Sequence, residues 1–263
     1  MRRIGGLLMA TGLTQASSLS FSTKVIHFVR HGQAMHNVNA ERIKAEGCTH
    51  DEFIAAMLAD DEFDAALTDI GRAQAEAAGN TEIFQSARLS TELVVGSPLS
   101  RALDTADITF PDDSLPLAKG NRISLESIRE INGMMLNGKR RSVSELSKLY
   151  PMWDFSIVPS DEDEAWTVDL ETNEAARERA YQSLCWMWDR PESTIALFAH
   201  GGIYMLLMDG SHEAVEVKGD GVSTRFHNCE LRTIEVTRVD GDDFSDDCGS
   251  TDSRPRFQLK MRG

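Results

Sequence analysis

The chain has 263 residues, of which 41% are hydrophobic and 26% charged, the composition of an ordinary globular protein with a sizeable core. This length leaves room for one full α/β domain. The formal net charge of −15 argues against nucleic acid or an anionic membrane as the main partner, because both are polyanions. An anionic small substrate would need a local cluster of Arg and His side chains to overcome this overall charge.

The first 23 residues differ in composition from the rest. They hold two arginines, a short apolar stretch and several Ser and Thr residues, with no acidic residue. The stretch is too short for a transmembrane helix, and the pattern predicts a cleavable signal or organellar transit peptide. A disordered extension explains it almost as well. We therefore expect an intracellular protein, cytoplasmic or organellar, whose folded domain begins at residue 24.

The four cysteines are spread along the chain and have neither a CxxC pair nor the spacing of a metal site; they are Cys48, Cys185, Cys229 and Cys248. We interpret them as free thiols rather than as a disulfide framework. This interpretation fits a reducing compartment.

Strand and helix patterns alternate along the chain. In chain order we expect a strand at 24–29, mostly helix at 39–60, a helix at 70–86 capped by Thr68 or Asp69, a strand at 92–96, a helix at 99–107, a strand at 121–128, a short helix at 142–149, a solvated acidic loop at 161–164, a long helix at 171–189, and strands at 194–199 and 231–239. The alternation predicts a single domain over residues 24–239, a three-layer α/β/α sandwich with a mostly parallel central sheet. Residues 240–263 are expected to be an acidic, disordered tail with a short terminal strand at 257–261.

Three of the predicted strands end in residues suited to binding an anion. These ends are Arg30-His31-Gly32, Ser97-Pro98 leading to Arg101, and His200-Gly201-Gly202. In open α/β sheets ligands bind at the carboxyl ends of the strands, so the three loops are expected to meet. Gly32 and Gly201 would allow the chain to turn sharply beside a bound anion.

The sequence resembles the histidine phosphatase superfamily, which includes the cofactor-dependent phosphoglycerate mutases. The resemblance rests on VIHFVRHGQAMHN (25–37), LTDIGRAQA (67–75), VVGSPLSRALDTA (94–106), Glu130 within IRE, and FAHGG (198–202), which occur in the family's order. The stretch 138–156 is similar to the plant and fungal phosphatase-type branch. A phosphoglycerate mutase-like fold is therefore implied.

The resemblance also implies roles for five residues. His31 would become phosphorylated, Arg30, Arg101 and His200 would hold the transferring phosphoryl group, and Glu130 would be the proton donor. A phosphoryl group in transfer spreads negative charge over its equatorial oxygens, so positively charged planar donors suit it. His31 must be neutral at its attacking nitrogen, and Glu130 must be able to give and take a proton.

Further residues are secondary candidates for substrate binding. In the family, residues at the positions of Asn37 and Ser97 often line the phosphate pocket. Arg140 and Arg141 could extend the basic pocket, although a solvated basic turn before a helix is an equally good interpretation. No His or Cys spacing suggests a metal ion, and neither a metal nor an organic cofactor is expected.

The leading hypothesis is a phosphatase that hydrolyses a small phosphate monoester through a phosphohistidine on His31. A mutase that returns the phosphoryl group to its substrate is the alternative, although the segment 133–141 is shorter than the substrate-closing segments of true mutases. A non-catalytic scaffold on the same fold is a weaker alternative, because all five site residues are present.

Overall fold

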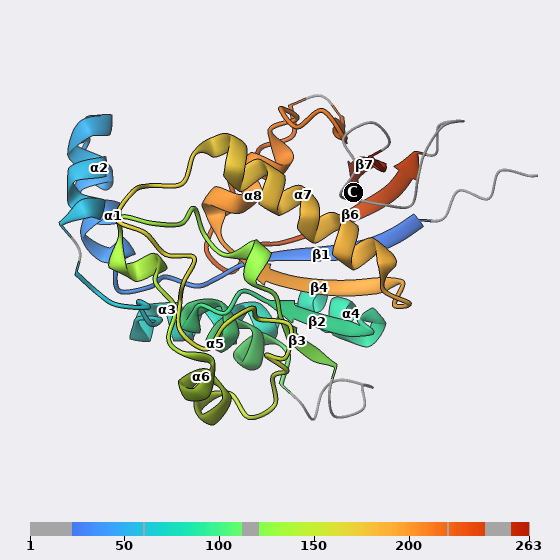
Figure 1. Cartoon of the computed structure of the whole chain (residues 1–263), viewed down its shortest axis with the longest axis horizontal. Helices are drawn as coiled ribbons and strands as arrows, with labels where there is room; N and C mark the ends of the chain where they lie inside the picture. Colours follow the sequence, from blue (N-terminus) through green and yellow to red (C-terminus); the bar gives the residue numbers. More distant parts are fainter. Residues whose placement is uncertain (1–22, 60, 112–120, 220, 240–253, 263) are drawn as a thin grey trace, which may run out of the picture.

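A computed structural model describes residues 23–59, 61–111, 121–219, 221–239 and 254–262. Within these residues one seven-stranded sheet has the strand order β3-β2-β4-β1-β6-β7-β5 (Figure 1). Its strands are β1 (Thr23–Arg30), β2 (Leu93–Gly96), β3 (Arg122–Ser124), β4 (Thr194–Ala199), β5 (Val215–Lys218), β6 (Leu231–Val239) and β7 (Arg256–Met261). The helices are α1 (Asn37–Ala45), α2 (His50–Leu58), α3 (Asp69–Gly79), α4 (Glu82–Ser90), α5 (Ser100–Thr109), α6 (Val143–Leu149), α7 (Asn173–Asp189) and α8 (Gly201–Met208), with short 3-10 helices at Glu126–Ile128 and Leu136–Gly138.

The sheet is mixed but mostly parallel. β3, β2, β4 and β1 pair in parallel, β6 pairs antiparallel with β1 and β7, and β5 pairs in parallel with β7. The expected mostly parallel sheet is therefore confirmed. The run of parallel strands matters most for function, because it brings the carboxyl ends of β2, β4 and β1 to the same edge.

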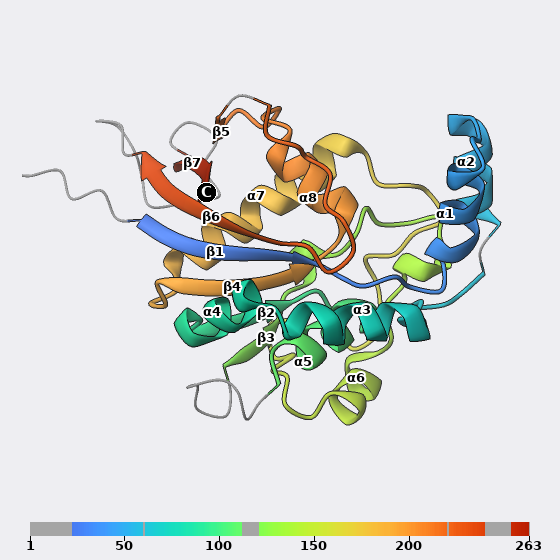
Figure 2. The same ribbon diagram turned by 180° about the vertical axis from the view of Figure 1, so that it is seen from behind.

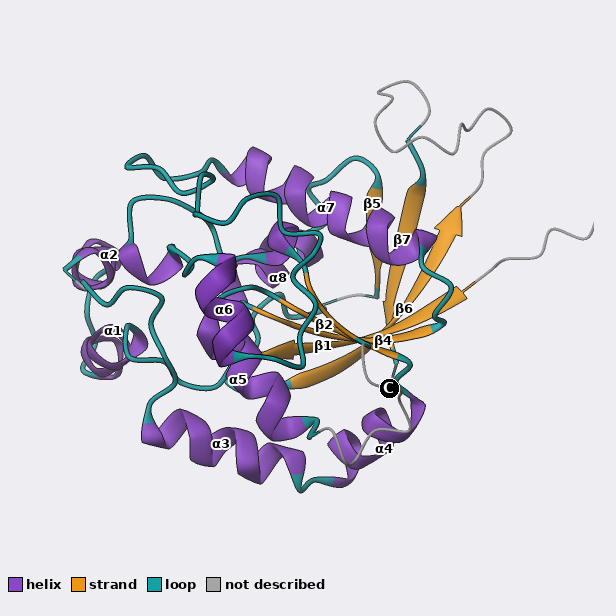
Figure 3. Ribbon diagram, turned by 60° about the horizontal axis from the view of Figure 1, so that its bottom comes forward, coloured by secondary structure: helices purple, strands orange, loops and turns teal. Residues whose placement is uncertain are grey.

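Helices cover both faces of the sheet, which gives the predicted three layers (Figures 2 and 3). α7 and α8 pack on one face, and α4, α5 and α6 on the other, with α3 against α5. Successive residues of β4 alternate between the two cores: Ile195 and Leu197 join the first, Ala196 and Phe198 the second. Both sets are buried, which explains why this strand is an unbroken apolar run in the sequence.

Two predicted helices are each divided in the structure. The expected helix at 39–60 is α1 and α2, separated at Gly47, whose φ of +92° favours glycine. The expected helix at 70–86 is α3 and α4, because Asn80 ends the first and Thr81 has the extended backbone of an N-cap. The predicted cap of α3 is confirmed, since the Thr68 hydroxyl accepts a hydrogen bond from the Gly71 N–H at 2.9 Å.

Two elements, α8 and β5, were not predicted from the sequence. α8 begins with two glycines and is apolar nearly all round, with five buried residues, so it lacks the one-sided pattern of a surface helix. β5 is only four residues long. The terminal strand expected at 257–261 is present as β7 and lies between β6 and β5.

The interpretation of the cysteines was wrong for Cys185, which is disulfide-bonded, whereas Cys48 and Cys229 are free. A disulfide depends on the distance between two Cα positions, which spacing along the chain does not give. The predicted targeting segment before residue 23 and the acidic tail at 240–253 lie outside the described residues. Among the described helices, none combines the length and the apolar character needed to cross a bilayer.

Candidate active site

The carboxyl ends of three neighbouring strands place the predicted site residues together. β4 lies between β2 and β1, with Ala199 opposite Arg30 and Phe198 opposite Gly96. The backbone pairing continues past the strands: the His31 N–H donates to the Ala199 carbonyl, and the Ser97 N–H to the Phe198 carbonyl. The loops that follow the three strands are therefore held side by side, as the sequence predicts.

His31 is oriented by its own loop. Its Nδ1 lies 2.6 Å from the Gly32 carbonyl oxygen, which can only accept, so Nδ1 carries the proton and Nε2 keeps a lone pair. The side chain is buried at 2% exposure. Burial, followed by the charges of Arg101 and Arg30, holds the pKa of His31 well below the ordinary imidazole value. A neutral imidazole with a free Nε2 is the form a nucleophile requires.

His200 lies next to His31, with the ring centroids 5.1 Å apart. It follows β4 directly and is the N-cap residue of α8. Its Nε2 lies 2.8 Å from the Ser97 hydroxyl oxygen, which ties the end of β4 to the end of β2. Burial, then the charge of Arg101 and the proximity of His31, lowers the pKa of His200 well below its usual range.

Two guanidinium groups face this histidine pair. Arg101 is fully buried on α5 and donates from Nη1 to the Asn137 carbonyl at 2.7 Å, while Arg30 donates from Nη1 to the Phe226 carbonyl at 2.8 Å. Among the described residues, Nε of both arginines and Nη2 of Arg101 are buried without a hydrogen-bond partner. Burial lowers the pKa of Arg101 to about 10, against the opposing effects of Glu130 and Asp64, so it stays charged at neutral pH. Buried, charged donors of this kind suit an oxyanion.

Glu130 is held at the N-terminus of α8. Its Oε1 accepts from the N–H groups of Ile131 and Ile203 at 2.9 and 3.1 Å, and its Oε2 accepts from that of Gly202 at 3.1 Å. A helix N-terminus favours a carboxylate because its backbone N–H groups have no partner within the helix. The carboxylate also opposes the effect of burial on the pKa of both Arg30 and Arg101, which places it within electrostatic reach of the two guanidiniums.

Gly32, the residue after His31, has a packing role in addition to the predicted turn. A Cβ atom on Gly32 would lie 2.6 Å from the Gly71 carbonyl oxygen of α3, so the loop and the helix approach too closely for a side chain. Gly201 is also confined, because a Cβ there would lie 3.2 Å from the Arg30 Nε. Gln74 of α3 contributes a further contact, because its side-chain oxygen accepts from the Gln33 N–H at 2.9 Å. α3 therefore holds the nucleophile loop in place.

The secondary candidate Asn37 also supports this loop. Its Oδ1 accepts from the Ala34 N–H at 3.1 Å, and its Nδ2 lies 2.9 Å from Nε2 of the buried His36. The ring of His36 lies 6.1 Å from that of His31.

The structure does not support Arg140 as a substrate ligand. Its Nε donates to Glu126, and its two Nη atoms donate to the carbonyls of residues 141 and 160–162. With every nitrogen engaged and the residue buried, Arg140 is a structural part of this loop. The acidic loop at 161–164 is solvated as expected at Asp161, Glu162 and Glu164. Asp163 is the exception, because its side chain is 1% exposed and paired with Arg129.

Arg141, in contrast, keeps a link to the site. Its Nε lies 3.1 Å from Oδ2 of the buried Asp64, and its side chain is 35% exposed. Asp64 accepts from the N–H and the hydroxyl of Ser100, the residue before Arg101. Arg141 therefore lies at the edge of the arginine cluster, with part of its surface open to solvent.

The acceptors that orient the two arginines had no sequence signal. They are the backbone carbonyls of Asn137 and Phe226. Since every residue type carries a carbonyl, only the course of the loops reveals them.

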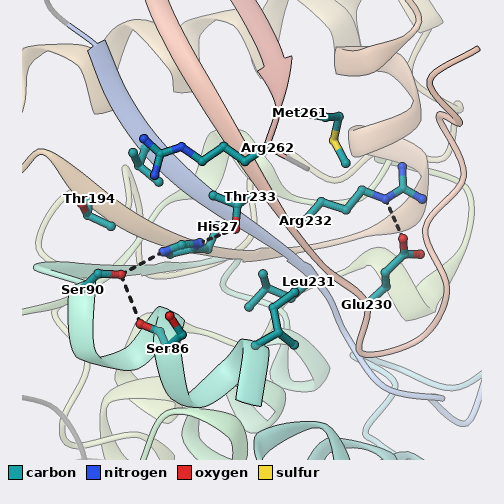
Figure 4. Close-up of a pocket in the computed structure, with 12 residues that line it drawn as sticks. His27, Ser86, Ser90, Thr194, Glu230, Leu231, Arg232, Thr233, Met261 and Arg262 are labelled. Atoms are coloured by element: carbon teal, nitrogen blue, oxygen red, sulfur yellow. Dashed lines mark hydrogen bonds and ion pairs between the residues drawn. The ribbon is translucent and has the colours of Figure 1, made fainter. Parts of the chain in front are cut away.

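A cavity of about 620 Å³ elsewhere on the sheet contains none of the predicted site residues (Figure 4). It is lined by β1, β6 and α4, and its polar groups pair with one another: His27 with Ser90 and Thr233, and Arg232 with Glu230. His27 is a core residue, with 5% of its surface exposed. In the described part of the chain, no three His, Cys, Asp or Glu side chains are grouped as a metal site requires.

Comparison with known proteins agrees with the resemblance seen in the motifs. The sequence profile of the Histidine phosphatase superfamily (branch 1) matches residues 26–242. "Phosphoglycerate mutase-like protein 1" of Arabidopsis thaliana is 32% identical over 255 residues, covering 87% of this chain and 86% of that protein. A second Arabidopsis thaliana protein, "Phosphoglycerate mutase-like protein", is 30% identical over 88% of this chain and 90% of its own length. Among solved structures, the ecdysone phosphate phosphatase from Bombix mori in complex with tungstate has a TM-score of 0.47 at 15% identity, over 80% of this chain and 88% of that one.

Proposed function

Since the chain belongs to the histidine phosphatase superfamily, branch 1, we propose that it hydrolyses a small phosphate monoester through a phosphohistidine on His31. The observation that carries this proposal is the state of His31. Its Nδ1 proton is held by the Gly32 carbonyl, its Nε2 keeps a lone pair, and the buried Arg101 and the partly buried Arg30 both act on it electrostatically.

In the first step, Nε2 of His31 attacks the phosphorus atom and the bond to the leaving oxygen breaks. The imidazole becomes positively charged, and the Gly32 carbonyl accepting from Nδ1 stabilises that charge. Arg30 and Arg101 offer their unpaired donors to the equatorial oxygens, where the negative charge of the transition state is spread. His200, neutral and adjacent to His31, adds a further contact to the same group.

Glu130 would complete the proton balance. In its acid form it gives a proton to the leaving alkoxide, and as a carboxylate it then takes one from the attacking water. Water attacks the phosphorus atom of phosphohistidine, the P–N bond breaks, and inorganic phosphate is released with His31 neutral again. Glu130 lies within electrostatic reach of both arginines, which supports a position beside the phosphoryl group that the two guanidiniums would hold.

Trapping the intermediate tests the proposal. The purified protein is mixed rapidly with p-nitrophenyl phosphate and quenched, and acid-labile, alkali-stable phosphate on the protein is mapped by mass spectrometry. We expect phosphohistidine at His31, its loss in His31→Ala, and no change in His227→Ala, whose side chain is exposed. Equal, near-zero phosphate release by wild type and His31→Ala across a panel of monoesters would favour the scaffold alternative.

A second candidate is phosphotransfer of the mutase type, suggested by the names of the plant relatives. The two functions share the first step and differ in the acceptor of the phosphoryl group. Incubation with 3-phosphoglycerate separates them: 2-phosphoglycerate with negligible free phosphate would indicate the mutase. We expect free phosphate instead.

A further inference from the structure

His36 is a buried histidine beside the proposed phosphate pocket that the reaction described above does not use. It is 5% exposed, and its ring lies 6.1 Å from that of His31. Arg101 and Arg30 both act on it electrostatically, and it acts in turn on His31 and His200. His36 therefore belongs to the same cluster of side chains.

The hydrogen bonds of Asn37 determine which nitrogen of His36 carries its proton. The Ala34 backbone N–H can only donate, so the atom of Asn37 that faces it at 3.1 Å is the oxygen, Oδ1. The other amide atom, Nδ2, is then a donor, and it lies 2.9 Å from Nε2 of His36. Nε2 must accept that hydrogen bond, so the imidazole is neutral and its proton is on Nδ1.

This Nδ1–H group has no acceptor among the described residues, although the atom is fully buried. A buried donor without a partner costs free energy, and such a group is retained where a ligand supplies the acceptor. The charged groups around it are the guanidiniums of Arg30 and Arg101. The acceptor that fits these surroundings is an anionic oxygen.

We propose that His36 is a phosphate-binding residue, whose Nδ1–H donates to an oxygen of the phosphoryl group carried by His31. It supplies a neutral donor beside the charged donors of the arginines, and its Nε2 at the same time orients the Asn37 amide. The inference rests on the proposed function and adds a specific ligand contact to it.

Two substitutions separate direct binding from a role through Asn37. His36→Asn keeps an amide donor near the position of Nδ1, whereas His36→Gln keeps a polar atom near that of Nε2. Binding of orthovanadate is measured by calorimetry on wild type, both variants and the exposed control His227→Gln, with thermal melts to verify folding. We expect His36→Gln to lose about 10- to 100-fold in affinity, as for one hydrogen bond to a charged group, and His36→Asn to stay within about threefold of wild type.

The reverse result, with vanadate affinity kept in His36→Gln and weakened in His36→Asn, would show that His36 acts only by positioning Asn37 and would overturn the proposal.

Nitrogen-15 NMR of histidine-labelled wild type gives a test that needs no variant. His36 should show a protonated Nδ1, whose proton resonance moves downfield when vanadate is added; a protonated Nε2 overturns the inference. If the wild-type protein forms phosphohistidine and both variants bind vanadate as tightly as wild type, this inference is wrong and the proposed function stands. If wild type neither forms phosphohistidine nor binds vanadate, the proposed function fails with it.

Discussion

Oε2 of Glu130 lies 3.1 Å from the backbone nitrogen of Gly202, the second residue of α8. The contact is so close that a methyl group on Gly202 would overlap Oε1 of the same carboxylate. The residue at position 202 therefore decides where the proposed proton donor can sit.

Gly202→Ala should impair proton donation while leaving the fold intact, because the atom in the way is the end of a flexible side chain. We expect a loss of about 10- to 100-fold in kcat/KM for alkyl phosphates, whose leaving group needs a proton, and a much smaller loss for p-nitrophenyl phosphate. Steady-state kinetics on the two substrates provides the measurement. Gly138→Ala is the matched control, since its Cβ would meet nothing closer than 3.9 Å. Equal losses on both substrates would argue against Glu130 as the donor.

Arg101→Lys keeps the charge but should still lower the rate of phosphoryl transfer by about 100- to 1000-fold. The guanidinium holds the Asn137 carbonyl with one nitrogen while leaving two others for a ligand, which a single ammonium group cannot do. Single-turnover kinetics of phosphohistidine formation measures the effect. The control is Arg72→Lys, where the side chain is 48% exposed and pairs with Asp104. A rate for Arg101→Lys close to that of wild type would mean that charge alone is sufficient.

Because His27 is buried, the free energy of unfolding of the protein should fall in mild acid. Burial, with a smaller effect from Arg262, lowers its pKa from 6.5 to about 4. Below pH 6.5 the unfolded chain takes up a proton that the folded protein does not, so the free energy of unfolding falls as the pH falls, by about 2 kcal/mol between pH 6.5 and 5.

Urea unfolding at pH 7 and pH 5 of wild type and His27→Gln checks this. Between pH 7 and pH 5 the free energy of unfolding of wild type should fall by about 2 kcal/mol more than that of His27→Gln. The exposed His227→Gln should show no such shift. Parallel curves for wild type and His27→Gln would contradict the prediction.

Asp163→Asn should destabilise the fold by about 3 kcal/mol, because it removes one charge of a buried ion pair. Asp163 accepts from both Nη atoms of Arg129 at 2.8 Å and from the Arg140 N–H at 2.9 Å. Burial by itself would raise the pKa of this carboxyl. The hydrogen bonds and charge of Arg129 outweigh that effect and lower the pKa below its usual value, so the folded state holds the ionised form. Denaturant unfolding measures the loss of stability of Asp163→Asn, and Asp169→Asn, at an exposed position, is the control. A loss no larger than that of the control would show that the pair contributes little.

The sequence by itself predicted the elements whose patterns are local. β4 is a continuous apolar run because it is buried on both faces, and Thr68 caps α3 because its hydroxyl satisfies a nearby N–H. α8 could not be found in this way, since a helix buried nearly all round shows no apolar stripe, and the division of α3 from α4 depends on backbone angles at Asn80 and Thr81.

The same division holds for the candidate site. The sequence placed His31, Arg101 and His200 at the ends of strands, and parallel topology is enough to bring such ends together. Only the tertiary structure decided that the nitrogens of Arg140 donate to Glu126 and to backbone carbonyls, while Arg101 has two donors that no described residue accepts from. The two are nevertheless the same residue type. The reason is physical: residue type fixes the donors a side chain has, but which of them are satisfied depends on acceptors contributed by distant parts of the chain.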